Sequence, residues 1–107
     1  MQDKVTTVLK AIADPTRREI FHVLVVATTA MPITEISNQF NMTRQGITKH
    51  LLTLNEAGLV EISKKGRERF CNANTGPLKE IHQWLNFYEQ FWDDTLGKLD
   101  AYLKDRT

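Results

Sequence analysis

The sequence predicts a small, mainly α-helical domain of about five helices that carries one two-stranded β-hairpin. Three observations lead to this fold class. Apolar residues recur at helical spacing in separate segments, residues 60–72 alternate around a glycine turn, and residues 78–103 form one long amphipathic run. With 107 residues the chain has the size of one domain, and we assign residues 1–107 to it.

The first two helices are separated by an Asp-Pro break. The first is expected from about Asp3 to Ala13, with the apolar residues of one side directed to a core. Asp14 then serves as an N-cap, and Pro15 occupies the first helical position, where its missing N–H costs nothing. The second helix is expected over Pro15–Ala27 and is followed by a loop over Thr28–Pro32.

A pair of short helices is predicted over about residues 34–58. In the first helix Ile33, Ile36 and Phe40 recur at helical spacing, and Thr34 is expected to be the N-cap. Asn41 and Met42 form the connector. Two helices joined by so short a connector form a helix-turn-helix.

Thr43 is expected to cap the second helix of this pair, and Gly58 ends it by taking a left-handed conformation. One stripe faces the core and consists of Ile47, Leu51, Leu54 and Ala57. The opposite side carries long polar side chains suited to base edges in a DNA major groove, namely Arg44, Gln45, Thr48 and Lys49. An ordinary helical hairpin without a DNA-binding function explains the same stretch equally well. The segment that follows, residues 60–72, favours the DNA-binding interpretation.

Residues 60–72 read as a β-hairpin around a Lys65-Gly66 turn. A hairpin directly after a recognition-type helix is a wing. Its basic residues are Lys64, Lys65, Arg67 and Arg69. In an extended strand Arg67 and Arg69 point to the same face.

Charge is distributed unevenly along the chain. The formal net charge is +1, yet residues 43–69 hold six Lys or Arg and three Glu, a local +3. Residues 70–107 hold four basic and six acidic groups, a local −2. Positive charge therefore collects on the two elements expected to approach a phosphate backbone.

The last helix, expected over about residues 77–104, is longer than a small domain needs to cover its core. At 1.5 Å per residue, Leu78–Leu103 spans about 39 Å. Its apolar residues form two stripes, and five of the nine aromatic residues of the chain lie between Trp84 and Trp92. Two apolar faces indicate that one face packs against the domain and the other against a partner, most simply an identical chain. The alternative is that both faces belong to the intramolecular core.

The composition argues against other classes of protein. The sequence lacks a glycine-rich phosphate loop, a nucleophile elbow and paired Cys or His residues, so we expect no enzyme and no cofactor. It holds no apolar run long enough for a membrane helix and no leader, which predicts a cytoplasmic protein without membrane contact. The single cysteine, Cys71, excludes an intramolecular disulfide and is expected to be a half-buried strand residue rather than a redox sensor.

Three segments resemble the arsenical-resistance-repressor (ArsR) family of winged helix-turn-helix transcription regulators. They are AIADPTRREIFHVL at residues 11–24, MTRQGITKHLLTLNEAGLV at 42–60, and KKGRERFCN at 64–72. The resemblance covers nearly the whole chain. It implies that the recognition helix enters the major groove, that the wing follows the backbone, and that the first and last helices form a homodimer.

Carried over residue by residue, the resemblance implies two sets of functional residues. The set at double-stranded DNA, or supporting the contact, is Thr43, Arg44, Gln45, Thr48, Lys49 and His50, with Lys65, Arg67 and Arg69 from the wing. The set at the dimer interface is Val5, Leu9, Trp84, Tyr88, Phe91, Trp92 and Leu99. The function implied is a dimeric repressor that binds a palindromic or pseudopalindromic operator, including one that controls its own gene.

The chain departs from the metal-sensing members of the family. They carry a Cys-x-Cys pair, or an Asp-x-His with a later histidine, whereas residues 35–39 here contain no thiol and His82 has no histidine after it. We therefore expect no bound metal and place the chain in the non-metal branch. Two alternatives stay open: a metal- or redox-responsive repressor with a site assembled across the dimer, and a winged-helix adaptor that binds protein. An adaptor would be expected to lack Arg44, Lys49 and the wing arginines.

Overall fold

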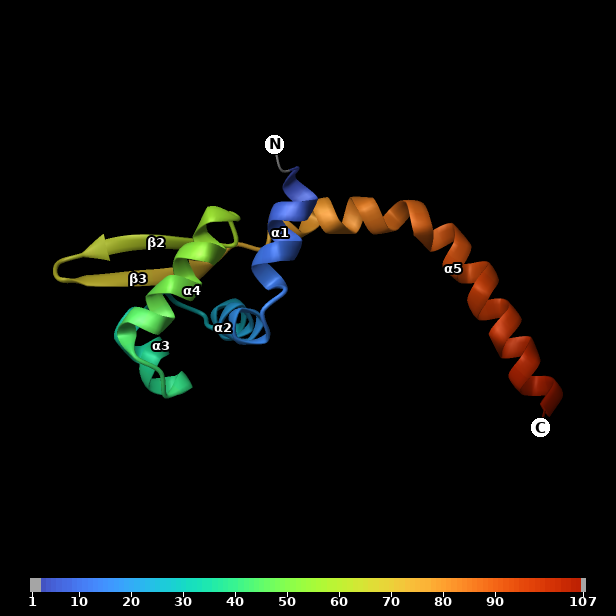
Figure 1. The fold of residues 1–107 in the computed structure, drawn as a ribbon, viewed down its shortest axis with the longest axis horizontal. Coiled ribbons are helices and arrows are strands. Elements are labelled where there is room, and N and C mark those ends of the chain that lie inside the picture. The colour runs from blue at the N-terminus through green and yellow to red at the C-terminus, as the bar shows by residue number, and fades with distance from the viewer. Residues whose placement is uncertain (1–2, 107) are drawn as a thin grey trace.

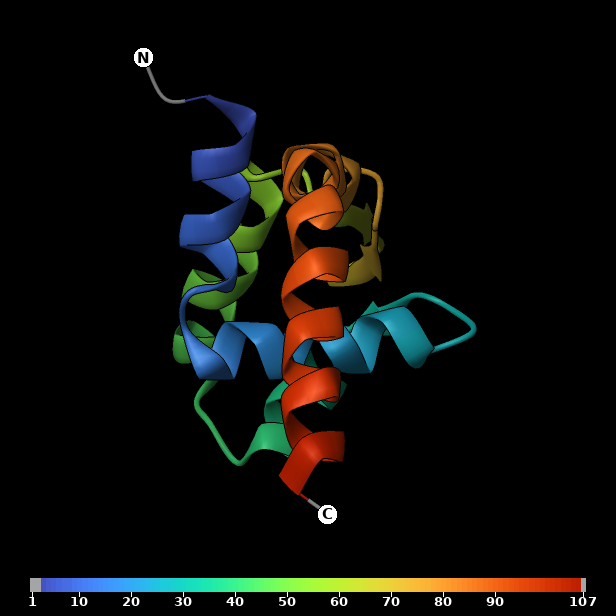
Figure 2. The same cartoon turned by 90° about the vertical axis from the view of Figure 1, so that its right-hand side faces the viewer.

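The computed structural model describes the backbone of residues 3–106 and the side chains of residues 3–92 and 103. Its elements, in chain order, are α1 (Lys4–Ile12), α2 (Pro15–Val26), β1 (Met31–Pro32), α3 (Ile33–Phe40), α4 (Arg44–Glu56), β2 (Val60–Lys65), β3 (Glu68–Ala73) and α5 (Leu78–Arg106). Helices α1 to α4 pack together, the β2–β3 hairpin projects from one end, and α5 leaves the other (Figures 1 and 2). This arrangement confirms the predicted mainly α fold with a wing.

The expected loop over Thr28–Pro32 was wrong at its end, because Met31 and Pro32 form a third strand. Met31 pairs with Cys71 and Pro32 with Phe70, so the antiparallel sheet has the order β1-β3-β2. A strand of two residues has no periodicity that the sequence could reveal. Its edge position also tolerates Pro32, whose missing N–H would break a central ladder.

The predicted N-cap at Thr34 was also wrong. Strand β1 leads directly into α3, which begins at Ile33 with Pro32 in the N-cap position, where the ring offers no hydrogen-bond acceptor. Thr34 lies inside the first turn, and its hydroxyl donates to Oε1 of Glu68 over 3.4 Å, joining α3 to the hairpin. Asn41 ends α3 in the left-handed conformation, with a φ of 51°.

Helix α4 has the two ends that the sequence predicts. Oγ1 of Thr43 accepts a hydrogen bond from the N–H of Gly46 over 3.1 Å. At the other end Gly58 takes a φ of 78°, and the N–H of Leu59 reaches back to the carbonyl of Leu54 over 2.9 Å. These ends fix the length of the helix and the direction in which the chain leaves it.

The core gathers residues from α1 to α4, from β2 and β3, and from the connection between α4 and β2. Its buried hydrophobic side chains are Val8, Ala11, Ile20, Phe21, Leu24, Ile33, Ile36, Ile47, Leu51, Leu54, Leu59, Val60 and Cys71. Leu78 and Ile81, at the start of α5, are partly buried and pack against this cluster. Beyond them α5 extends away from the core (Figure 1).

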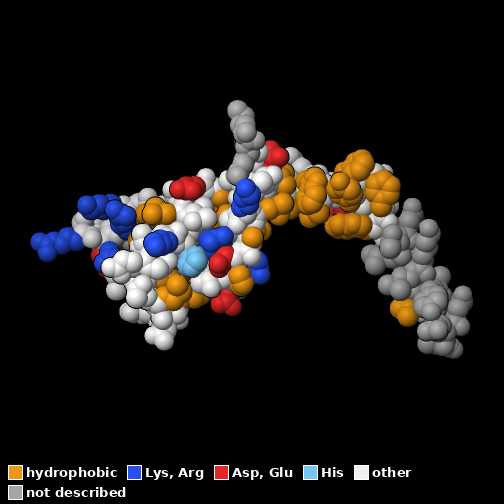
Figure 3. Space-filling model, in the orientation of Figure 1, with side chains coloured by type: hydrophobic (Ala, Val, Ile, Leu, Met, Phe, Trp, Pro, Cys, Tyr) orange, Lys and Arg blue, Asp and Glu red, His pale blue; other side chains and the backbone are white. Residues whose placement is uncertain are grey.

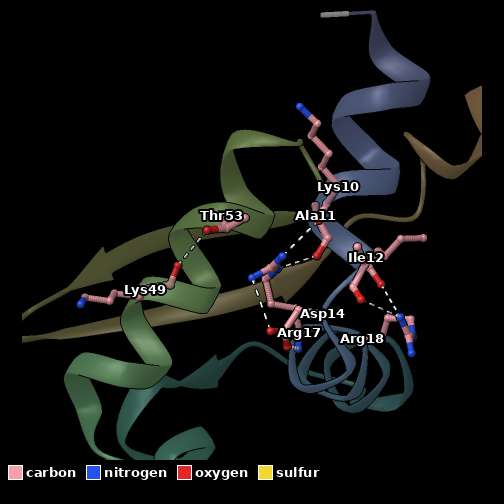
Figure 4. A network of polar contacts seen from close by, with 9 residues as sticks. Lys10, Ala11, Ile12, Asp14, Arg17, Arg18, Lys49 and Thr53 are labelled. Carbon is pink, nitrogen blue, oxygen red and sulfur yellow. Dashed lines mark hydrogen bonds and ion pairs between the residues drawn. The ribbon is translucent and has the colours of Figure 1, made fainter.

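The corner between α1 and α2 is held by Asp14 and two arginines (Figure 4). Oδ1 of Asp14 accepts from the N–H of Arg17 over 3.1 Å and so caps α2. Arg17 donates from Nε to the carbonyl of Ala11 over 2.6 Å and from Nη2 to that of Lys10, while Arg18 donates to the carbonyl of Ile12 over 2.7 Å. Arginines from α2 therefore donate to carbonyls of the last turn of α1, where helix geometry leaves acceptors short of N–H partners; the carbonyl of Lys10 also accepts from the N–H of Ala13 over 3.3 Å.

We predict that Arg17→Met lowers the free energy of unfolding by about 1–3 kcal/mol, because it removes charge-assisted hydrogen bonds and retains most of the aliphatic stem. Urea denaturation followed by circular dichroism measures the loss. Arg44→Met, which makes the same chemical change at an exposed position, is the control and should change stability by less than about 0.5 kcal/mol. Equal losses in the two variants would contradict the capping role of Arg17.

Candidate nucleic-acid interface

Helix α4 presents a polar face because its apolar side is completely enclosed. Ile47, Leu51 and Leu54 have no exposed surface. Arg44, Gln45 and Lys49 lie on other sides of the helix and are exposed. The packing of the apolar stripe thus sets the direction in which these three side chains leave the protein.

The two predicted threonines are already engaged within the helix. The hydroxyl oxygen of Thr43 forms the N-cap described above, so Thr43 orients the start of the helix. Thr48 is half-buried, and its hydroxyl donates to the carbonyl of Arg44 over 2.7 Å. Its oxygen keeps lone pairs that accept hydrogen bonds, and its methyl group stays available for apolar contact.

His50 lies on a different side of α4 from Gln45 and Lys49. It follows Lys49 directly, so at 100° per residue its side chain leaves α4 in another direction, and it is half-buried. The N–H of Arg17 is the main cause that lowers the pKa of Asp14, and the charges of Arg17 and His50 lower it further. His50 therefore lies in the electrostatic environment of the α1–α2 corner. This position agrees with the expectation that His50 supports the DNA-contacting residues and does not itself contact a base.

The hairpin turns at Gly66 and Arg67, one residue later than the sequence indicated. Gly66 takes a φ of 63°, which the first position of a two-residue hairpin turn requires. Arg67 consequently lies at the tip and not in β3. The expectation that Arg67 and Arg69 share one face of an extended strand was therefore wrong.

The cross-strand register divides the basic residues of the wing between its two faces. Lys64 is paired with Arg69, and Lys65 is paired with Glu68. Since side chains alternate along a strand, Lys64 and Arg69 share the face that carries Cys71, and Lys65 lies on the other face. Nζ of Lys65 lies 6.0 Å from the centroid of the Phe70 ring. Lys64, which the predicted DNA-contact set omits, is therefore the neighbour of Arg69; only the register reveals this.

Positive charge gathers on one end of the molecule. In Figure 3 Lys and Arg side chains cover the projecting hairpin and continue onto the adjoining body, with a histidine among them. Lys64 and Arg69 are like charges directly opposite each other, an arrangement that destabilises a hairpin unless an anion lies nearby. The two elements together offer hydrogen-bond donors for base edges and cations for phosphates.

The apolar side chains of α5 form a separate exposed surface. Trp84, Phe87, Tyr88, Phe91 and Trp92 are 40–61% exposed. Several of these rings contact each other: the centroids of Trp84 and Tyr88 are 5.7 Å apart, and those of Phe87 and Tyr88 are 5.1 Å apart, both edge to face. On α1, Leu9 is 38% exposed and Val5 is half-buried. Leu99, predicted for the same interface, lies outside the residues whose side chains are described.

Cys71 lies at the centre of the sheet and is fully buried, more deeply than predicted. Burial raises the pKa of its thiol to about 11. Among the residues that the structure describes, no group of three or more His, Cys, Asp or Glu is placed to hold a metal ion. Within the same residues, none of the helices is long and apolar enough to cross a membrane.

The fold and the site define a winged helix-turn-helix DNA-binding protein. Residues 12–63 match a family described as a helix-turn-helix domain. Transcriptional repressor SdpR of Bacillus subtilis strain 168 is 36% identical over 81 residues, which make up 75% of this chain and 88% of SdpR. An uncharacterized HTH-type transcriptional regulator of the same organism, YuzN, is 37% identical over 81 residues, 69% of this chain and 86% of YuzN.

Solved structures agree with these sequence relatives. An ArsR-like transcriptional regulator from Rhodococcus sp. RHA1 has a TM-score of 0.70 and 30% identity, with 92% of each chain covered. The crystal structure of another ArsR family transcriptional regulator has a TM-score of 0.74 and 26% identity, over 85% of this chain and 98% of that one. The chain belongs to the ArsR family of winged helix-turn-helix transcription regulators and is not an enzyme.

We predict that the Cys71 thiol resists modification in the folded protein. Since its pKa is raised to about 11 from an ordinary value of 9.0, the thiolate that reacts is scarce at neutral pH. Because a raised pKa means that the folded state holds its proton longer, stability should fall as the pH rises from about 9 to 11. Labelling by a maleimide with and without urea, and urea unfolding at pH 8 and pH 10.5, measure both effects.

Cys71→Ala supplies the control for the pH effect, because it retains every other titrating group. Between pH 8 and pH 10.5, the free energy of unfolding of the wild type should fall relative to that of Cys71→Ala. Rapid labelling of the native protein would contradict this account and would revive a redox-responsive function.

Proposed function

We propose that the protein is a dimeric repressor that binds a pseudopalindromic operator, with α4 of each protomer in the major groove and the wing along the adjoining backbone. The observation that carries the proposal is the exposed polar face of α4 beside a basic hairpin. In helix-turn-helix proteins the second helix of the motif is the one that enters the groove. We extend the proposal to an operator that controls the gene of the protein itself.

Base reading is assigned to the exposed start of α4. Arg44 can donate two hydrogen bonds to O6 and N7 of a guanine, and Gln45 can pair with N6 and N7 of an adenine. Lys49 lies one turn after Gln45 and reaches a guanine or a phosphate. Thr43 and His50 support this face, and Thr48 contributes its free lone pairs and methyl group.

Backbone contact is assigned to the wing. Lys64 and Arg69 repel each other across the hairpin, and a phosphate between them would relieve the repulsion. Arg67, at the tip, extends farthest along the duplex and is free of the constraints of a strand. Lys65 is on the other face of the hairpin, opposite Glu68 in the strand register, so we expect it to contribute least of the four.

Dimerisation is assigned to the aromatic surface of α5, together with Val5 and Leu9 of α1. Five large aromatic side chains on one segment leave an apolar surface that a second copy would remove from water. Closed two-fold symmetry makes the same surface serve both partners. The same axis relates the two α4 helices, so that their half-sites form a palindrome.

The first test of this proposal concerns the dimer. We expect Phe91→Glu with Trp92→Glu to convert a wild-type dimer into monomers, because the charges would enter the apolar interface. Light scattering coupled to size-exclusion chromatography measures the mass. Val26→Glu is the control, since Val26 is 63% exposed and belongs to α2, a helix that is not assigned to the interface. A wild-type monomer at micromolar concentration would contradict the proposal.

The second test separates base reading from backbone contact, using duplexes selected from a random pool by the purified protein. Arg44→Ala or Gln45→Ala should cost about 1–3 kcal/mol on the enriched duplex and relax the preference at particular base pairs. Lys64→Ala or Arg69→Ala should weaken enriched and scrambled duplexes alike. The slope of log K against log salt concentration should also become shallower, by about one unit for every phosphate that the variant no longer neutralises.

Fluorescence anisotropy at several salt concentrations measures both sets of variants, with Lys79→Ala on α5 as the control for loss of one positive charge. A helix variant that weakens both duplexes equally would show that α4 does not read bases. A pool from which no sequence is enriched would contradict operator binding itself.

A further inference from the structure

One apolar side chain stands within the polar face of α4. Leu52 is 44% exposed, whereas Leu51 and Leu54 beside it are completely buried. Leu52 therefore contributes little to the core. We therefore look for the role of Leu52 in its position on the exposed side of the helix and not in core packing.

Leu52 continues the stripe assigned to DNA. Counting from Gln45, the residues at intervals of three, four and seven are Thr48, Lys49 and Leu52, which share one side of the helix. The next residue of the stripe, one turn after Leu52, is Glu56. Glu56 lines the cavity beside Lys4 and Pro77, at the far end of α4, and its carboxylate would be repelled by phosphate. Leu52 is thus the last residue of the stripe that suits DNA.

The floor of the major groove offers one apolar group, the C5-methyl of thymine. A leucine cannot satisfy the donors and acceptors of the other bases, so it favours a thymine where its side chain meets a base. Leu52 lies about 10.5 Å along the helix from Gln45. This corresponds to roughly three base steps of 3.4 Å.

The aromatic surface of α5 does not explain the exposure of Leu52. Figure 1 shows α4 and the hairpin on one side of the body and the extended part of α5 on the other. A contact with a second copy through α5 would therefore leave Leu52 in solvent. The wing, in contrast, flanks the same end of the molecule as α4.

We propose that Leu52 is a specificity-determining residue that selects a thymine by contact with its C5-methyl group, about three base steps from the base pair read by Gln45. The inference rests on the proposed function, because it requires α4 to lie in the major groove. It adds a hydrophobic selection that the polar residues of α4 cannot make.

The test removes the methyl group from the DNA and the side chain from the protein in turn. In the duplex most enriched from a random pool, each thymine of one half-site is replaced by deoxyuridine, which lacks the methyl group and keeps its base pairing. Wild type and Leu52→Ala are titrated against every duplex by anisotropy. Val26→Ala is the matched control, since it shortens an exposed apolar side chain on α2.

We expect deoxyuridine at one position to weaken DNA binding by the wild type about fourfold. This corresponds to the loss of about 0.8 kcal/mol for one buried methyl or methylene group. The same substitution should leave Leu52→Ala unchanged, while Val26→Ala should behave as wild type. The inference is overturned if no position weakens wild type, or if Leu52→Ala responds at each position as wild type does. Either result, obtained on an enriched duplex, leaves the proposed operator binding intact; failure to enrich any duplex removes the basis of both.

Discussion

The rest of the structure depends on the enclosure of one side of α4. Ile47, Leu51 and Leu54 reach the core from this helix and are fully buried there, together with Ile36 of α3 and Val60 of β2. Rotation of α4 by one residue would expose part of this stripe and bury charged side chains, at a cost of several kcal/mol. The orientation of Arg44, Gln45 and Lys49 is therefore a consequence of core packing, and the two ends of α4 fix where along the chain it applies.

The elements that the sequence predicts correctly are those with a local physical signal. Asp14-Pro15, Thr43 and Gly58 mark helix ends because capping involves neighbouring residues only. Strand β1 has no such signal, since Met31 and Pro32 pair with residues some forty positions later. The early start of α3, which displaced the expected cap at Thr34, follows from the same long-range pairing.

The candidate site shows the same division between local and long-range information. The polar face of α4 is visible from helical spacing, and the basic wing from composition. The faces of the wing are not, because the position of the turn decides them: Gly66 occupies the first turn position, so Arg67 moves to the tip and Lys64 pairs with Arg69. A shift of one residue in a hairpin exchanges every side chain between the two faces.

The corner between α1 and α2 connects the two surfaces of the molecule. Arg17 holds the carbonyls at the end of α1, while Asp14 caps α2 and shares an electrostatic environment with His50 of α4. Helix α1 also packs against α5, which carries the exposed aromatic residues. The segment ADPTRR thus fixes α1, and with it α5, relative to α4. In the dimer proposed above, the spacing of the two α4 helices would have to match the pitch of DNA, and the contacts of this corner would help to set that spacing.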